Sequence, residues 1–442
     1  MSEIPHVKMP DAISPANSGT GEDLLVYEAL TSAVEEYKLT NSERAAEFWN
    51  SEKGSLKEIA KAKDLAAEYF LRTAEKVVRS NESNRDLWAD RFTQATKELF
   101  GEPDKVESAR LLGNEYRFLN TLHGNEAVSQ QYVDFLLSTY GYIISESGIS
   151  LVEEDNDEQE KEAIQKYGDA MLEKYNPLFD LIDESGKTEF SPKDLKELFD
   201  DAIVWLKDNE DSDWGEWATI YTDNTFLAVD VRNRVIKIGS RREVATAIDA
   251  KGLIAHELLV HALRGKNGYK TDDKELATGL ADRGIAEEGL GILVEEAING
   301  DLPDKAYDRY LDIAIALGSI DGIQRTRQET FDISFARQLI REQFRGTFNE
   351  ADIPSLKRRV WGHIDRIYRG GPGDSLDTRQ AIYTKDIIYY VGYKQMSKYV
   401  TEQLTSNRKP SEVLEYLSRG KFDPTKPEHV ERLNKSKLIT QL

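Results

Sequence analysis

Two histidines and a glutamate in the segment LIAHELLVHALRGKNG are residue types that bind and use a metal ion. His256 and His261 lie five positions apart, and Glu257 follows the first of them. In the common zinc-peptidase pattern H-E-x-x-H the histidines are four apart, share one helix face and bind zinc, while the glutamate acts as general base. On an α-helix, positions five apart differ by about 140° and cannot share a metal ion. One extra residue in a π-turn brings the two rings together, so we predict a π-turn within residues 256–261.

The surroundings of the two histidines favour a metal site over a chance pattern. The chain has six histidines, and this pair is flanked by the apolar runs GLIA and LLV. Burying two imidazoles and a carboxylate together costs several kcal/mol unless something compensates them. A bound metal ion provides that compensation.

A third ligand is expected from a downstream acidic segment. A catalytic zinc site has three protein ligands and an open position for water, and the chain has no cysteine. The segment GIAEEGLGILVEEAI has a helical pattern and carries Glu287 and Glu288. The spacing does not separate these two residues, and an acidic pair is also typical of a solvent-exposed first turn of a helix.

The sequence pattern around these residues predicts an α+β fold that is mostly α. We expect a flexible tail over 1–22, a helical region over 23–165 and a metal-binding domain over 166–442. Short β-branched and aromatic runs, EWATIYT, FLAVDV and RVIKIG, predict a small antiparallel sheet beside the histidine helix. Ser191 and Asp194 form a capping pair at the start of an earlier helix, and we expect the histidine helix to end at Gly265.

Composition excludes several classes of protein. The net charge of −22 argues against a nucleic-acid partner, because phosphates are held by dense basic surface. The N-terminal residues show no signal-peptide pattern, and no apolar run approaches the roughly 20 residues that cross a bilayer. We therefore expect a soluble cytoplasmic protein without a membrane partner. The oligomeric state is left open.

Several segments of the chain resemble those of a known family. HELLVH followed by EEGLG is similar to the microtubule-associated tyrosine carboxypeptidases and their bacterial homologues, which carry an HExxxH helix and a QEGLA motif. The run HALRGKNG and the later segments RIYRGG and YTKDIIYYVG also resemble family segments, so the likeness covers about 214–393. Glu287 stands where the motif has Gln, and Gly291 where it has Ala.

The resemblance implies a zincin-like zinc metallopeptidase of the carboxypeptidase type. It places His256, His261 and Glu288 as ligands of Zn²⁺ and Glu257 as the general base, and so favours Glu288 over Glu287. The substrate would be the C-terminus of a peptide or protein, with tyrosine or another aromatic residue as the candidate leaving group. Characterised members act on acidic tubulin tails, but this chain is itself acidic and would not attract them. The reaction type is therefore what the resemblance implies.

The family-like segments also contain candidates for contacts with the substrate. Tyr389 is a candidate oxyanion donor, with a core tyrosine as the plainer interpretation. A carboxypeptidase must hold a free carboxylate, which basic side chains do well. The candidates are Arg264, Arg366, Arg369 and Lys385, and for each of them an ordinary surface ion pair is the plainer interpretation.

The alternative hypothesis is a non-catalytic zinc-stabilised scaffold or binding protein. A structural site closes its fourth position with a protein ligand, and His363 could provide it. A retained Glu257 argues against this alternative, because a structural site has no use for a base.

Overall fold

The computed structural model describes residues 85–149, 158–280, 283–346, 348–368 and 381–438, and these form two compact units. The first unit combines the described residues up to 149 with 307–387, and the second combines 158–306 with 388–438. The expected tail over 1–22 lies outside the described residues. The expected boundary at 165/166 falls inside a helix, and residues 307–387 belong with the first unit rather than with the histidine helix.

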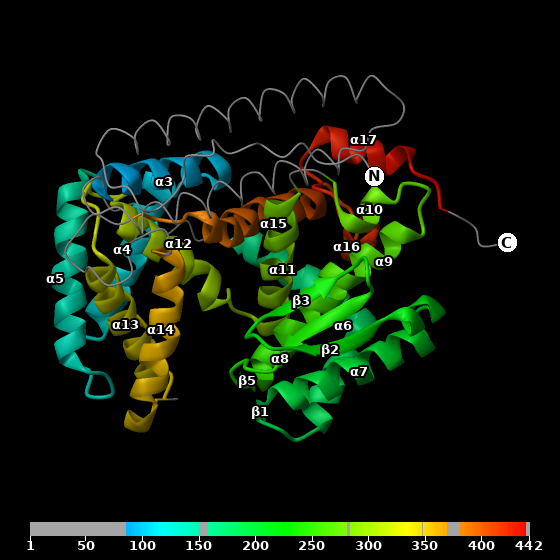
Figure 1. Cartoon of the computed structure of the whole chain (residues 1–442), viewed down its shortest axis with the longest axis horizontal. Coiled ribbons are helices and arrows are strands. Elements are labelled where there is room, and N and C mark those ends of the chain that lie inside the picture. The colour runs from blue at the N-terminus through cyan, green and yellow to red at the C-terminus, as the bar shows by residue number, and fades with distance from the viewer. Residues whose placement is uncertain (1–84, 150–157, 281–282, 347, 369–380, 439–442) are drawn as a thin grey trace, which may run out of the picture. The chain divides into compact units, whose positions relative to one another are not determined.

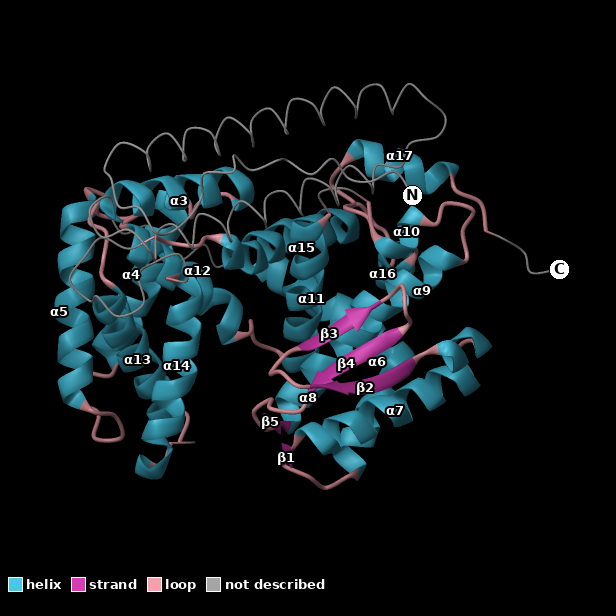
Figure 2. Cartoon of the chain, in the orientation of Figure 1, coloured by secondary structure: helices cyan, strands magenta, loops and turns pink. Residues whose placement is uncertain are grey.

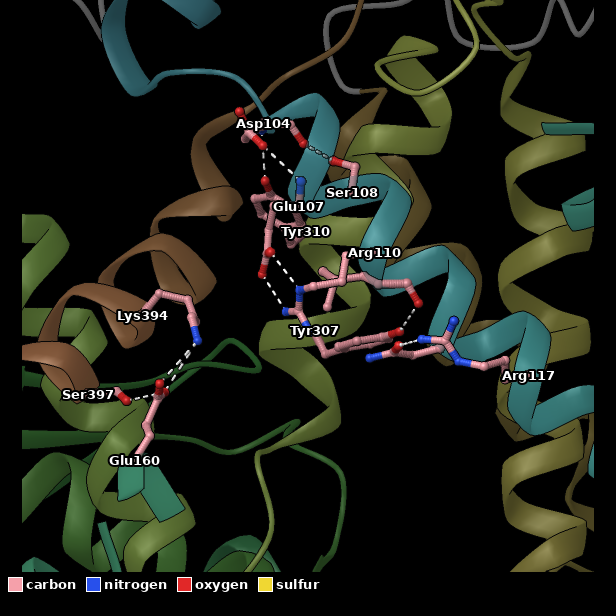
Figure 3. A network of polar contacts seen from close by, with 12 residues as sticks. Asp104, Glu107, Ser108, Arg110, Arg117, Glu160, Tyr307, Tyr310, Lys394 and Ser397 are labelled. Carbon is pink, nitrogen blue, oxygen red and sulfur yellow. Dashed lines mark hydrogen bonds and ion pairs between the residues drawn. The ribbon is translucent and has the colours of Figure 1, made fainter. Parts of the chain in front are cut away.

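The first unit is built from helices (Figure 1). Its elements are α3 (Arg85–Phe100), α4 (Lys105–Thr121), α5 (Gln130–Ser147), α12 (Asp304–Leu317), α13 (Arg327–Phe344), α14 (Ile353–Ile367) and the short turns η3 (Glu350–Asp352) and η4 (Lys385–Ile387). Polar contacts tie α4 to α12: the N–H of Asp104 donates to Tyr310 Oη at 2.8 Å (Figure 3). The described part of the expected helical region is therefore helical.

A buried ionic network joins the helices of the first unit. Arg337 is 1% exposed, and its Nε donates to Asp308 while its Nη2 donates to Asp312. His363 Nε2 lies 3.0 Å from the other oxygen of Asp312. Burial raises the pKa of Asp312, but Arg337 and His363 outweigh burial and hold it below its ordinary value. His363 is thus a partner of a buried carboxylate.

The second unit contains the remaining helices and all described strands. Its helices are α6 (Glu158–Glu184), α7 (Pro192–Asn209), α8 (Ala247–Leu253), α9 (Leu263–Tyr269), α10 (Glu275–Thr278), α11 (Gly284–Asn299), α15 (Ile388–Thr405), α16 (Pro410–Ser418) and α17 (Pro427–Lys435), with the 3₁₀ turn η1 (Ser212–Glu216). The predicted capping pair is confirmed, because Ser191 and Asp194 bond each other's backbone N–H at the start of α7. Glu160 of α6 is held by Lys394 of α15 (Figure 3). A membrane-crossing helix is not found in the described part of the chain.

The sheet is present where the β-branched runs predict it, but its pairing differs. The strands β2 (Ala218–Thr222), β3 (Leu227–Asp230) and β4 (Val235–Gly239) lie in the order β2-β4-β3 (Figure 2). β3 pairs antiparallel with β4, whereas β2 pairs parallel with it, so the sheet is mixed and the prediction of an antiparallel sheet was wrong. A separate two-residue pair joins β1 (Glu189–Phe190) and β5 (Ala245–Thr246).

The histidine helix contains the predicted π-turn. α8 leads directly into a π-helix, η2 (Ile254–Ala262), which continues as α9. The N–H of Leu263 donates to the carbonyl of Leu258, five residues earlier, as a π-turn requires. The predicted end at Gly265 was wrong: the helix runs on to Tyr269. A Cβ at Gly265 would come within 2.5 Å of Val231, so this glycine allows the helix to pack closely beside the hairpin of β3 and β4.

A pair of glycines brings the second acidic helix into place. α11 packs against α15 at Gly289 and Gly392, where a Cβ on either residue would collide with the other helix's backbone. α11 also packs against η2. The close backbone approach fixes the rotation of α11 and turns Glu288 toward the histidine helix.

Candidate metal centre

His256, His261 and Glu288 form a group of three possible metal ligands. The two Nε2 atoms are 3.0 Å apart, and Glu288 Oε2 lies 3.8 Å from His256 Nε2 and 4.0 Å from His261 Nε2. Among the described residues, no other histidine or carboxylate joins this group of atoms, which lie within 4.8 Å of one another. The structure therefore brings together the three residues that the resemblance implies as metal ligands.

Both imidazole rings are oriented by carboxylates on their far side. His256 Nδ1 lies 2.5 Å from Glu295 Oε1, and His261 Nδ1 lies 2.9 Å from Glu287 Oε1. A carboxylate accepts hydrogen bonds, so each Nδ1 carries a proton, and each Nε2 is left to bind a cation, which can be a proton or a metal ion. Two lone pairs facing each other at this distance repel unless a cation lies between them. A carboxylate behind each histidine is the usual arrangement around bound zinc.

The carboxylate behind His261 is held in a buried ionic cluster. Arg264, which is 1% exposed, donates from Nη1 to Glu287 Oε2 at 2.6 Å, and Lys421 Nζ lies 2.9 Å from Glu287 Oε1. Burial raises the pKa of Glu287, but Arg264 and Lys421 outweigh it and hold the pKa well below its ordinary value. Glu287 is therefore a charged acceptor in a fixed position.

The carboxylate behind His256 comes from the same face of α11 as the ligand. Glu288, Gly291 and Glu295 follow one another at spacings of three and four, which places them on one side of the helix. Lys305 Nζ contacts Glu295 Oε1 at 2.7 Å. Burial raises the pKa of Glu295, but Lys305 and His256 outweigh burial and hold the pKa below its ordinary value, so this side chain also remains charged.

The three members of the triad shift one another's pKa values toward the charged forms. Burial lowers the pKa of His256, but its contacts with Glu288 and Glu295 raise it to about 10. Burial raises the pKa of Glu288, and the two histidines bring it down to about 2. In the chain alone a proton on Nε2 can bridge the rings, and a metal ion would compete with that proton for the same two nitrogen atoms.

The distances within the triad are compatible with a bound metal ion. A triangle with sides of 3.0, 3.8 and 4.0 Å has a circumradius of about 2.1 Å, close to the ~2.0–2.2 Å of zinc bonds to histidine and carboxylate. The donor set of two imidazoles and one carboxylate is also a known zinc set. Gly291 adjoins the ring of His256, and a Cβ there would lie 2.5 Å from Nε2. Gly291 therefore makes room for the ring.

Two side chains lie beside the triad without belonging to it. Glu257 is half-buried in the π-helix, next to His256. Arg242, in the loop after β4, is half-buried, and within the described residues its guanidinium makes no hydrogen bond or ion pair. Burial lowers the pKa of Arg242, and the charges of Glu257, Asp249 and Glu295 oppose that shift. Arg242 is therefore a cation near Glu257 that pairs with no carboxylate of the described residues.

The other predicted site residues occupy different environments. Arg264 is buried, and each of its three guanidinium nitrogens donates to Glu287 or to the carbonyls of Gly420 and Phe422, so its placement is that of an internal ion pair. Tyr389 is half-buried in the first turn of α15.

The remaining basic candidates lie outside the second unit or outside the described residues. Arg366 and Lys385 belong to the first unit, where Arg366 donates to Asp386 and Lys385 lies 5.8 Å from the ring of Phe100. Arg369 is not among the described residues.

Comparison with known proteins adds no identification. No family model, no curated protein and no solved structure matches this chain.

The sequence reasoning missed the carboxylates behind the histidines and missed Arg242. The spacing of Glu288 and Glu295 by seven residues was a usable signal, because ligand histidines need carboxylate partners and positions seven apart share a helix face. Glu287 was considered only as a rival ligand. No sequence pattern marks Arg242.

Proposed function

We propose that this chain is a zinc-dependent metallopeptidase, acting as a carboxypeptidase on a peptide or protein C-terminus. The observation that carries the proposal is the pair of imidazoles whose Nε2 atoms face each other at 3.0 Å while each Nδ1 is held by a carboxylate. The resemblance of the histidine and acidic segments to tyrosine carboxypeptidases supports the same reaction class.

The three-membered donor set favours a catalytic site over a structural one. Structural zinc sites close the fourth position with a protein ligand, whereas catalytic sites keep it for water or substrate. His363, the side chain that could have closed the site, bonds Asp312 in the first unit. The scaffold alternative is therefore less well supported than the enzyme.

Each residue of the site has a role in peptide hydrolysis. His256, His261 and Glu288 would hold the zinc ion, and Glu287 and Glu295 would keep the two imidazoles in the ligating orientation. A bound zinc ion supplies a Lewis acid that polarises the scissile carbonyl and lowers the pKa of water toward about 7. Glu257 would accept the proton of the attacking water and return it to the leaving nitrogen.

The free carboxylate of the substrate needs a cation near Glu257. Arg264 is buried and already bonds Glu287 and two backbone carbonyls. Arg242 has a guanidinium without a fixed partner among the described residues, and it is close enough to Glu257 for the two charges to act on each other. An arginine fork pairs with both oxygens of a carboxylate, so Arg242 is the best-supported residue for this contact.

A peptide-cleavage assay tests the proposed reaction. Wild-type protein and Glu257→Gln, both loaded with zinc, are incubated with a library of short peptides, and the released amino acids are identified by mass spectrometry. We expect wild type to release single C-terminal residues and Glu257→Gln to release essentially none. Zinc binding without cleavage of any peptide would contradict the enzyme and favour the scaffold.

A further inference from the structure

A polar pocket lies in the second unit, apart from the metal triad. It has a volume of about 370 Å³, within the range of small-molecule sites. None of the three triad residues lines it. Its walls come from η1 and the following Trp217, from Arg234 in the turn between β3 and β4, and from the segment that begins in α9.

The residues that line this pocket carry a small net positive charge, whereas the chain as a whole is negatively charged. Four basic side chains line it, namely Arg234, Lys266, Lys270 and Lys274, against three acidic ones. The chain as a whole carries a net charge of −22. A local excess of positive charge in such a chain favours an anionic ligand at this place.

Two of the ammonium groups converge on one oxygen atom. Lys266 Nζ lies 2.9 Å from Asp211 Oδ2, and Lys270 Nζ contacts the same oxygen. Asp213 is 4.0 Å from Lys270. Two cations thus share one oxygen of Asp211, and Asp213 reaches Lys270 only at 4.0 Å, so a further anion near Lys270 would strengthen this cluster.

The buried position of Lys266 makes this imbalance costly. Lys266 is 6% exposed, and burial lowers its pKa to about 8. Its ammonium group also lies 5.5 Å from the ring of Trp214. The lowered pKa indicates that the surrounding carboxylates only partly compensate this charge.

Aromatic side chains complete the walls of the pocket. Trp217, which is 5% exposed, and Tyr269, which is half-buried, both line it. Flat rings next to paired cations suit an organic molecule that carries an anionic group on an apolar body.

We propose that this pocket binds a small organic anion, with its carboxylate or phosphate oxygens between Lys266 and Lys270 and its body against Trp217 and Tyr269. The site is distinct from the metal centre and does not depend on the proposed peptidase activity. Carboxylate and phosphate share the chemistry that the two lysines recognise, and the choice of probes separates them.

Calorimetric titration of the full chain with four probes tests this site. Benzoate and phenyl phosphate carry a ring with a carboxylate or a phosphate, inorganic phosphate lacks the ring, and benzamide is the neutral counterpart of benzoate. We expect saturable one-to-one binding of benzoate or phenyl phosphate, weaker binding of inorganic phosphate and none of benzamide. The stronger of the first two identifies the anionic group. Absence of saturable binding, equal binding of benzamide, or inorganic phosphate binding as tightly as phenyl phosphate would overturn the proposal.

Three variants locate the binding. Lys270→Gln should weaken the preferred probe at least about tenfold, the loss expected for one charge-assisted hydrogen bond. Lys237→Gln is the matched control, because Lys237 is a half-buried lysine that pairs with Asp230 on a neighbouring strand, and it should bind as wild type does. His261→Ala should also bind normally. Loss of binding in His261→Ala, or wild-type affinity in Lys270→Gln, would place the anion elsewhere and refute the assignment.

Discussion

Gly291 packs directly against the ring of His256, so Gly291→Ala is a sharp test of the metal centre. A Cβ at Gly291 would lie 2.5 Å from Nε2 and 2.7 Å from Nδ1 of the His256 ring. Non-bonded heavy atoms pack best at about 3.5–4.0 Å, so the ring must move by about 1 Å. The ring cannot move freely, because it is 5% exposed and its Nδ1 is held by Glu295.

The size of this displacement sets the expected effect on zinc affinity. A metal site tolerates errors of about 0.2 Å in its ligand distances, and disturbing the support of a ligand typically costs ~10–100-fold in affinity. Overpacking should also lower the free energy of unfolding by about 1–3 kcal/mol. Gly291→Ala would make the segment more similar to the QEGLA motif, and we nevertheless expect it to weaken the site.

The control for this substitution is on the same helix. A Cβ at Gly284 meets nothing within 4 Å, so Gly284→Ala should bind zinc as wild type does and raise stability by up to about 1 kcal/mol. Zinc affinity is measured by competition with a chelating dye, and stability by urea unfolding. Wild-type zinc affinity in Gly291→Ala would refute the placement of the His256 ring against Gly291.

Three further predictions concern the charges around the site and in the first unit. Glu287→Gln removes the counter-charge of two buried cations and should lower the free energy of unfolding by about 3–5 kcal/mol. The control Glu162→Gln, at an exposed position, should cost far less, and equal losses in urea unfolding would contradict this. The pKa of Asp312 is lowered by folding, so its contribution to stability is present above about pH 4 and disappears as the pH falls below that value. Asp312→Asn should therefore be less stable at pH 7 and lose less stability between about pH 4 and 2; an unchanged slope would be inconsistent with the lowered pKa. In the peptide-cleavage assay, Arg242→Gln should raise KM about tenfold or more for substrates with a free C-terminus, with little change in KM for C-terminally amidated substrates. The control is Arg241→Gln, which alters an exposed neighbour and should leave KM unchanged for both kinds of substrate.

The histidine spacing was the most informative feature of the sequence. Positions five apart on a helix cannot share a metal ion, and the apolar surroundings of His256 and His261 made separate burial costly, so the π-turn followed from geometry. The strands were predictable because β-branched residues gather between turn signals. The parallel pairing of β2 with β4 was not predictable. A turn signal shows that the chain reverses, but it does not show that β4 lies between β2 and β3.

Long-range partners explain the remaining differences. Arg264 lies in a segment that resembles the family, but its partners Glu287, Gly420 and Phe422 lie 23 to 158 residues away along the chain. Local sequence cannot distinguish a buried arginine with such partners from one that faces a substrate. Glycine is typical of a helix end, but the helix continues beyond Gly265, and the missing side chain there allows close packing against Val231.

Bound zinc in four proteins tests the metal centre most directly. Wild type, Glu257→Gln, His261→Ala and Glu288→Ala are equilibrated with zinc, freed of excess metal by gel filtration and analysed by atomic emission. We expect about one zinc per chain in wild type and Glu257→Gln and a large loss in the two ligand variants, with all four proteins folded by circular dichroism. A wild-type protein without zinc, or a His261→Ala protein that retains it, would contradict the assignment of His256, His261 and Glu288 as a metal site.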